Sequence, residues 1–202
     1  MKRLAIGFLG AIALGTPPAL AFDPVHVQAT LDTKSCFTCD IAGAEFIDAD
    51  LTGFYLAYAI AIGTDFSGAK MTNGFFALGI APDANFTGAD LTNTNFESAN
   101  LTGANFTEAI LTDAQLTNAS LRNAVMVGAI LINANVTRAN LRAADLTGAN
   151  LTEANFTNAL LSAANLTDAD LTGANLNRAS MSGTIFCRTI MPDGTTNNTG
   201  CP

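Results

Sequence analysis

The residues that could do chemistry in this chain are few, namely four cysteines and one histidine. Cys36 and Cys39 form a Cys-Phe-Thr-Cys motif, a spacing found in redox-active dithiols and in zinc sites. The motif has no second ligand pair nearby and no trailing histidine, which disfavours zinc and haem attachment. Cys187 and Cys201 lie near the other end of the chain, and His26 stands alone. Structural disulfides are therefore favoured over a redox or metal function.

The charge balance excludes one class of ligand. The 202 residues contain 17 acids and 9 bases, which gives a formal net charge of −8. Direct binding of nucleic acid needs clustered Lys and Arg, so it is disfavoured. The chain also contains no P-loop, no EF-hand loop and no acid–base–nucleophile set. We therefore expect a non-enzyme with no cofactor, no metal and no catalytic residue.

The first 21 residues read as a secretory signal peptide. Met1-Lys2-Arg3 is basic, residues 4–15 are apolar or small, and Ala19-Leu20-Ala21 fits the cleavage rule. The apolar run is too short to cross a bilayer of about 30 Å, so we expect no integral membrane segment in the mature chain. The predicted location is an exported compartment, either the periplasm or the thylakoid lumen.

A five-residue repeat occupies the body of the chain. The thirty positions that end in 1 or 6, from Phe46 to Met191, hold Leu, Phe, Met or Val in all cases except Ala61 and Ala81. Two residues before each of these centres lies a small residue, which is Ala in 23 of the thirty pentads. A period of five fits neither a helix nor a plain strand. It indicates a solenoid in which each pentad forms one side of a coil.

The phenylalanines indicate how many sides a coil has. Every phenylalanine that occupies a centre falls on a position ending in 6, and none falls on a position ending in 1. A three-sided coil would mix the two classes, whereas a four-sided coil keeps them on opposite walls of a densely packed interior. We therefore expect four sides, about 7–8 coils, and a core ladder formed by Phe46, Phe66, Phe76, Phe86, Phe96, Phe106, Phe156 and Phe186.

Units such as Ala149-Asn150-Leu151-Thr152-Glu153 resemble the pentapeptide repeat family, whose repeat is A(D/N)LXX. The resemblance implies an all-β fold, a right-handed quadrilateral β-helix with four pentads per coil. Residues 33–40 and the Cys-rich tail resemble the ends of exported members from photosynthetic bacteria. We expect a signal peptide at 1–21, an N-terminal cap at 22–38, the β-helix at 39–193 and a C-terminal cap at 194–202.

The two ends of such a rod need caps. A short helix can begin at Asp23 and Pro24, with Val25, Val27 and Leu31 as its apolar residues. At the other end we expect a disulfide-closed turn. Because the cysteine pairs lie at opposite ends of the rod, only two bridges would join Cα atoms within about 7 Å of each other. These are Cys36–Cys39 and Cys187–Cys201.

Residues twenty apart should stack, so the outer surface can be sorted by face. The pentads stacked on Phe46 and Leu51 carry twelve acids against Lys70 and Arg188, whereas the other two faces hold two acids and four arginines. Columns of stacked polar residues, such as Asn135-Asn155-Asn175, predict hydrogen bonds between coils. One cluster of outward apolar residues, here called the apolar patch, contains Tyr55, Tyr58, Ile60, Ile62, Phe75, Leu78 and Ile80.

Two functions from different classes follow. An exposed apolar patch usually marks an interface, unless another segment covers it. The favoured function is an exported structural or protein-interaction module whose partner is an unidentified protein, with a second copy of the chain among the candidates. The alternative rests on the family resemblance alone: an acidic rod that imitates B-DNA and protects or inhibits DNA gyrase. The signal peptide opposes that alternative.

Overall fold

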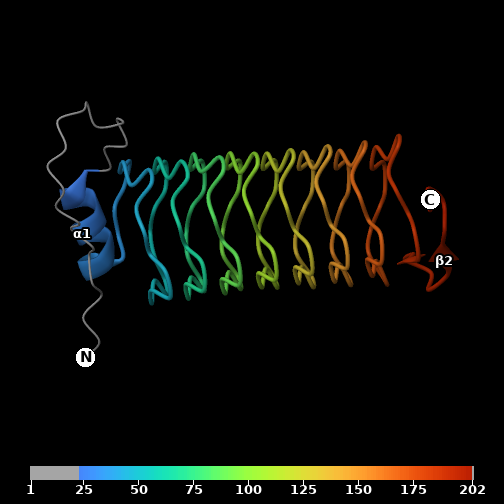
Figure 1. The fold of residues 1–202 in the computed structure, drawn as a ribbon, viewed down its shortest axis with the longest axis horizontal. Helices are drawn as coiled ribbons and strands as arrows, with labels where there is room; N and C mark the ends of the chain where they lie inside the picture. The colour runs from blue at the N-terminus through green and yellow to red at the C-terminus, as the bar shows by residue number, and fades with distance from the viewer. Residues whose placement is uncertain (1–22, 202) are drawn as a thin grey trace, which may run out of the picture.

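The chain winds into a rod of stacked coils that runs from the N-terminal helix to a small hairpin at the other end (Figure 1). The computed structural model describes residues 23–201. The proposed signal peptide, residues 1–21, lies outside the described residues. The helix α1 spans Pro24–Thr33, and the two short strands are β1, Thr189–Ile190, and β2, Thr196–Asn197. No helix within residues 23–201 combines the length and the apolar character that crossing a membrane requires.

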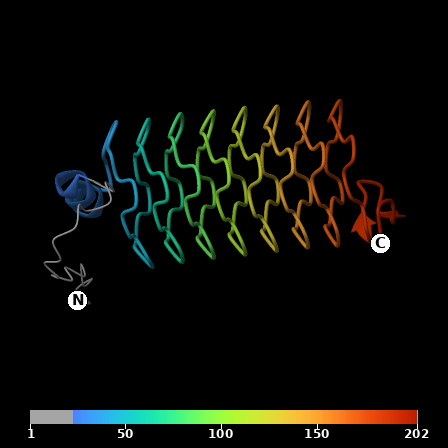
Figure 2. The same cartoon turned by 45° about the horizontal axis from the view of Figure 1, so that its top comes forward.

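Parallel bridges join each coil to the next with an offset of twenty residues. Tyr55 bridges Phe75, which bridges Asn95, and the same offset persists to the pair Asp170 and Ile190. Residues twenty apart therefore lie next to each other along the rod. Successive coils repeat the same outline in the turned view (Figure 2).

A turn at every fifth residue bends the chain. Each position ending in 3 or 8, from Thr38 to Arg188, has a positive φ between 53° and 71°. The centre of most pentads accepts a hydrogen bond across this turn, as when the N–H of Ala49 donates to the carbonyl of Phe46 at 3.1 Å. Glycine, Asn and Asp tolerate this left-handed conformation best, which explains why they dominate these positions.

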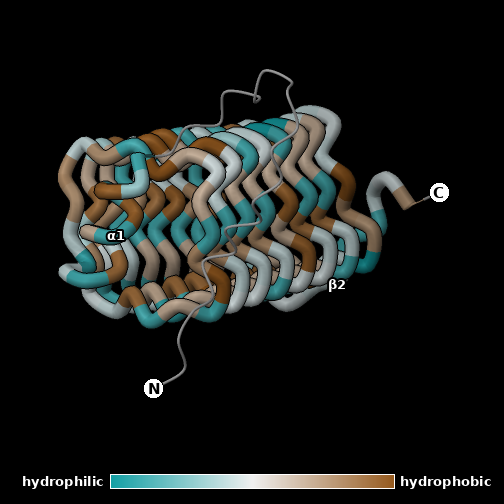
Figure 3. Tube along the Cα trace, turned by 60° about the vertical axis from the view of Figure 1, so that its left-hand side comes forward, coloured by the Kyte–Doolittle hydropathy of each residue, from teal (hydrophilic) through white to brown (hydrophobic). Residues whose placement is uncertain are grey.

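The interior is apolar and filled by the two inward residues of each pentad. The rings of Phe46, Phe66, Phe86 and Phe106 stack with centroids 5.3, 5.1 and 4.8 Å apart. Phe96 meets Phe86 edge to face at 5.9 Å, so rings from the two phenylalanine columns meet inside the rod. Apolar and polar residues recur at corresponding places in successive coils (Figure 3).

The buried threonines keep this interior free of unpaired hydroxyls. Thr64, Thr94, Thr184 and Thr189 occupy small inward positions, and each donates to a backbone carbonyl 23 residues earlier at 2.6–2.8 Å. Burying a hydroxyl costs little when it is hydrogen-bonded, so Thr replaces Ala there without opening the core.

The outer Asn columns bond between coils, as expected, but more often within a pentad. Asn135 Nδ2 donates to Gln115 Oε1 one coil earlier at 3.2 Å. The side chain of Asn135 accepts from the N–H and hydroxyl of Thr137 at 3.2 and 2.6 Å, and Asn155 does the same with Thr157. These bonds close a local turn within one pentad. Bonds between coils are fewer, such as the one from Asn165 Nδ2 to Thr147 Oγ1 at 2.9 Å.

Helix α1 covers the N-terminal end of the rod. The Asp23 side chain caps it by accepting from the N–H of Val25 at 2.8 Å, and Val27 and Leu31 pack against the core. Val25 was expected to face the core, and this expectation is wrong, because its side chain is 72% exposed. A ten-residue helix lying across the end of a rod has one buried side, and Val25 lies on the other.

Candidate functional site

The apolar patch lies at the N-terminal end of the rod and is open to solvent. Tyr55, Tyr58, Ile62, Leu78 and Ile80 are each 42–48% exposed, while Ile60 and Phe75 are half-buried. Bridges between Tyr55 and Phe75, and between Ile60 and Ile80, hold neighbouring members at strand spacing. The side chains therefore form one continuous surface rather than scattered apolar points.

Phe37 extends the apolar patch, and the sequence analysis missed it. Its ring is 58% exposed and meets Tyr58 edge to face at 5.4 Å and Tyr55 at 6.4 Å. Tyr55 in turn stacks on Phe75 at 5.2 Å. The twenty-residue offset was the available signal, since Phe37 precedes Ala57 by one coil.

The N-terminal helix leaves the apolar patch bare. Val27 and Leu31 pack on the interior residues at the end of the rod. Tyr58 and Leu78 keep almost half of their surface exposed despite this cap. Helix α1 therefore closes the end of the rod and does not cover its side, and within residues 23–38 the ring of Phe37 is the part of the cap that reaches Tyr58.

Two residues of the apolar patch adopt a backbone conformation that is unfavourable for large side chains. Tyr58 and Leu78 have φ values of 58° and 60°, and from Thr38 to Arg188 they are the only large apolar residues at the turn positions. A left-handed conformation costs an L-residue roughly 1–2 kcal/mol. Local strain of this kind supports a hypothesis of function at the strained residues.

The charged residues leave the acidic faces mostly unpaired. Within the described part of the chain, the ion pairs of lysine and arginine join Lys34 to Asp50 at 3.1 Å and Arg188 to Asp168 at 2.6 Å. The backbone N–H of Thr52, together with Lys34, holds the pKa of Asp50 well below its usual range. The remaining carboxylates of these faces keep the surface negative.

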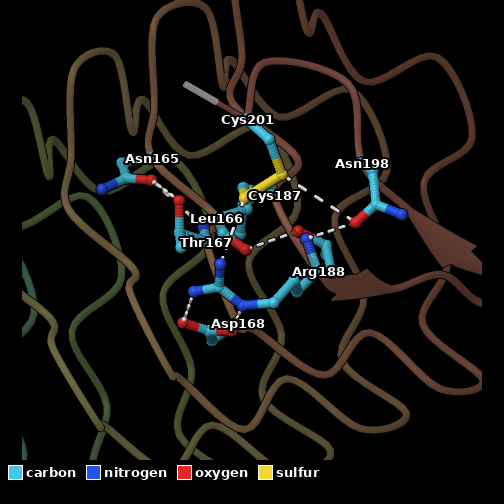
Figure 4. A network of polar contacts seen from close by, with 9 residues as sticks. Asn165, Leu166, Thr167, Asp168, Cys187, Arg188, Asn198 and Cys201 are labelled. Carbon is cyan, nitrogen blue, oxygen red and sulfur yellow. Dashed lines mark hydrogen bonds and ion pairs between the residues drawn. A yellow bond between two sulfur atoms is a disulfide. The ribbon is translucent and has the colours of Figure 1, made fainter.

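The C-terminal cap combines a disulfide, an ion pair and a hairpin. Cys187 and Cys201 are bridged, with Cα atoms 4.6 Å apart. Arg188 donates from Nε and Nη2 to the two carboxylate oxygens of Asp168, each at 2.6 Å, and its N–H donates to Asn198 Oδ1 at 3.1 Å (Figure 4). The Arg188 hydrogen bond lowers the pKa of Asp168, and Asp168 raises the pKa of Arg188.

The N-terminal cap holds the second disulfide and the histidine. Cys36 and Cys39 are bridged, with Cα atoms 5.6 Å apart. The Nδ1 atom of His26 accepts a hydrogen bond from the N–H of Asp40 at 3.1 Å, which joins helix α1 to the first coil. Within residues 23–201, no three His, Cys, Asp or Glu side chains are grouped closely enough to hold a metal ion.

The other residues singled out from the sequence lie inside the rod. The eight phenylalanines of the core ladder are all buried, and Phe186, at 8%, is the most exposed of them. Phe156 lies on the same column as Phe76 and Phe96, with Leu116 and Val136 between. These residues define the shape of the rod and offer no group for binding or catalysis.

Comparison with known proteins gives a family and a fold. A family model described as pentapeptide repeats matches residues 37–73, 83–118, 109–148 and 149–186, with eight copies. None of the curated proteins matches this chain. QnrB1, a plasmid-mediated fluoroquinolone resistance protein, is 22% identical over 74% of this chain and 78% of its own, with a TM-score of 0.55.

Two other solved structures are similar. HetL, a pentapeptide repeat protein involved in heterocyst differentiation regulation from the cyanobacterium Nostoc sp. strain PCC 7120, is 24% identical over 81% of this chain and 91% of its own, with a TM-score of 0.43. A pentapeptide repeat protein from the Arabidopsis thaliana thylakoid lumen is 27% identical over 60% of this chain and 68% of its own, with a TM-score of 0.39.

The family model covers more than half of the residues, and its spans coincide with the coiled region. The stacked coils are thus the right-handed β-helix in which such repeats fold. The chain belongs to the pentapeptide repeat family.

Proposed function

We propose that this protein is an exported, non-enzymatic interaction module that binds a protein partner through the apolar patch. The observation that carries the proposal is the exposure of Tyr58 and Leu78 at turn positions that disfavour them. Most of the other turn positions hold Gly, Asn or Asp, and the rest hold small, polar or charged residues. The fold alone therefore gives no reason for large apolar side chains at these two positions. Burial against a partner gives one.

Export is supported by the two disulfides. Disulfides persist in oxidising compartments and are rare in the cytosol. Cys36–Cys39 and Cys187–Cys201 use every cysteine of the chain. Together with the leader at residues 1–21, they favour the periplasm or the thylakoid lumen. The asymmetry of charge between the acidic faces and the other two faces would orient a partner before contact.

The alternative, a B-DNA mimic acting on gyrase, has weaker support. The acidic faces suit it, but gyrase is cytoplasmic and the disulfides favour export. Likeness of fold does not establish function. Imitation of the charge of DNA also gives no reason for the exposed aromatic rings.

We also propose the finer form of the solenoid. Bridges at an offset of twenty residues and a turn at every fifth residue support a four-sided coil of about 7–8 turns. The proposed segments are the signal peptide at 1–21, the N-terminal cap at 22–38, the β-helix at 39–193 and the C-terminal cap at 194–202.

Intact mass after thiol alkylation tests export. Protein taken from fractionated cells of its native host should lack residues 1–21 and carry no labelled cysteine. A full-length chain with four labelled thiols in the cytosolic fraction would overturn the proposal and favour the gyrase alternative.

Tyrosine labelling tests the binding surface. The chain has two tyrosines, Tyr55 and Tyr58, and both lie in the apolar patch, so iodination of tyrosine reports on this surface alone. We expect labelling to be slow in the native extract and fast after purification and dilution. Equal rates in the two samples would show that nothing covers the apolar patch in the cell.

A variant pair gives the matched control. Tyr58→Asp suits the left-handed turn, adds a charge to the apolar patch and should restore fast labelling of Tyr55 in the extract. Asn133→Asp makes a similar change at a turn on another face and should leave the protection intact.

A further inference from the structure

We propose that the partner is a second copy of this chain, bound side by side and antiparallel along the face that carries Tyr58. This inference rests on the proposed function and names its partner. The face is defined by the column of turn residues on it, namely Tyr58, Leu78, Ser98, Asn118, Arg138, Asn158 and Arg178. We call it the Tyr58 column.

The Tyr58 column is divided along its length. Its N-terminal end holds the two large apolar residues Tyr58 and Leu78, and its C-terminal end holds Arg138 and Arg178. Backbone bonds stack these positions coil by coil, from the N–H of Tyr58 to the carbonyl of Ala77 at 3.2 Å onward. The column therefore changes from apolar to cationic along one straight line.

The charges on this face lack partners within the chain. Glu97 lies beside Ser98 at the N-terminal half, and both it and Arg138 are exposed. Among the described residues, neither Glu97, Arg138 nor Arg178 lies within 4.0 Å of an opposite charge. Glu97 and Arg138 are two coils apart, about 10 Å along the rod. These charges are therefore available for pairing with charges on a second molecule.

A second copy supplies that complement when it is reversed. A two-fold axis through Asn118, perpendicular to the rod, places each position of the column opposite the one equally far from Asn118 in the other direction. Tyr58 then faces Arg178 of the second copy, and Ser98 faces its Arg138. Glu97 lies one residue to the side of Ser98, which is within reach of an arginine side chain.

Each of the contacts formed in this arrangement is favourable. An arginine over a tyrosine ring gives a favourable cation–π contact. Two copies of the Glu97–Arg138 pair arise, because a two-fold interface uses the same surface twice. Complementary charges of this kind select the orientation of the partners.

Other arrangements of two copies fit less well. Parallel rods would set Arg138 and Arg178 against themselves, and like charges in contact are repulsive. Overlap of the apolar patch alone uses only the first coils, whereas stable interfaces bury about 800 Å² per partner. The reversed, full-length overlap uses about 29 Å of the rod, from Tyr58 to Arg178.

Charge reversal provides the test, using the purified mature protein. We expect Glu97→Arg and Arg138→Glu each to weaken self-association at least tenfold in sedimentation equilibrium. An equimolar mixture of the two variants should restore it, because both contacts across the heterodimer then pair an arginine with a glutamate. Glu108→Arg, on an acidic face, is the matched control and should leave association unchanged.

The shape of the dimer supplies an independent readout. Small-angle scattering should show a dimer with nearly the length of the monomer and a larger cross-section. A dimer of doubled length, or single variants that associate like the wild type, would overturn the side-by-side arrangement.

The two proposals can fail separately. A purified protein that stays monomeric at every concentration, while Tyr55 and Tyr58 are protected in the extract, would overturn self-association and leave the binding function standing. Tyrosines that label equally fast in extract and in purified monomer would contradict both.

Discussion

The ring of Phe54 occupies the space that a side chain at Gly74 would need. A Cβ built on Gly74 would lie 1.8 Å from Phe54 Cε1, although both residues occupy the small inward position that is usually Ala. Phe54 is 1% exposed, so the ring is part of the core directly behind the apolar patch. The two residues form a large–small pair across neighbouring coils and depend on each other.

Replacing the glycine should therefore destabilise the rod. We expect Gly74→Ala to lower the free energy of unfolding by about 1–3 kcal/mol, because the new methyl group overpacks the site. Urea unfolding measures the change. Phe54→Ala should cost about 3–5 kcal/mol through the cavity it leaves. The double variant should cost less than the sum, and strictly additive costs would contradict the pairing.

The stacked phenylalanines should contribute different amounts to the stability of the fold, according to their aromatic neighbours. Phe86 contacts Phe66, Phe106 and Phe96, whereas Phe156 has no aromatic contact among the described residues. We expect Phe86→Leu to cost more stability than Phe156→Leu by about 0.5–1.5 kcal/mol for each aromatic pair that the substitution removes. Equal midpoints of urea unfolding for the two variants would show that the rings act by volume alone.

Neighbouring alanines should respond in opposite ways to the same substitution. Ala143 is an exposed turn residue with φ 56°, and Ala144 is 1% exposed in the core. Because Asn tolerates the left-handed conformation, we expect Ala143→Asn to stabilise the protein by about 0.5–1 kcal/mol. Ala144→Asn should destabilise the protein by about 1–3 kcal/mol or more, because the buried side-chain amide of the new Asn would have no hydrogen-bond partner. Thermal unfolding of the two variants decides the sign.

The ion pair of the C-terminal cap should depend on pH. The pKa of Asp168 is lowered by Arg188, so the pair stabilises the folded state above the usual Asp pKa of about 4. This stabilisation is lost as the pH falls through the folded pKa. We expect Asp168→Asn to lower the thermal midpoint slightly at pH 7, with the difference vanishing in acid. Asp113→Asn, which removes a carboxylate with no cationic partner among residues 23–201, is the control. If the thermal midpoints of the two variants depended on pH in the same way, this account would be contradicted.

The repeat made the core predictable, because a strict period of five assigns each residue its side without knowledge of the rest of the chain. Phe46 and its fellow centres are buried as this register requires, and the family match is shown by comparison. The two disulfides follow from the same logic, since a rod separates the cysteine pairs.

Features outside the repeat were harder to predict. Val25 lies on a helix of ten residues, too short for its apolar positions to define one buried side. Phe37 precedes the first pentad with an apolar centre at the regular register, so its contact with Tyr58 follows only when the twenty-residue offset is extended into the cap. Asn135 bonds both within its own turn and along the column, because its Oδ1 accepts from Thr137 while its Nδ2 donates to Gln115 one coil earlier.

The uninterrupted twenty-residue offset makes the length of this rod adjustable only in whole coils. Inserting or deleting twenty residues would leave every later side chain facing the direction it faces now. An insertion of ten between Leu78 and Arg138 would instead rotate everything beyond it by half a turn and keep every phenylalanine centre on its own pair of walls. Arg138 and Arg178 would then leave the face that carries Tyr58, while the core packing and the hydrogen bonds would be almost unchanged. The proposed side-by-side contact would be lost in a protein that still folds.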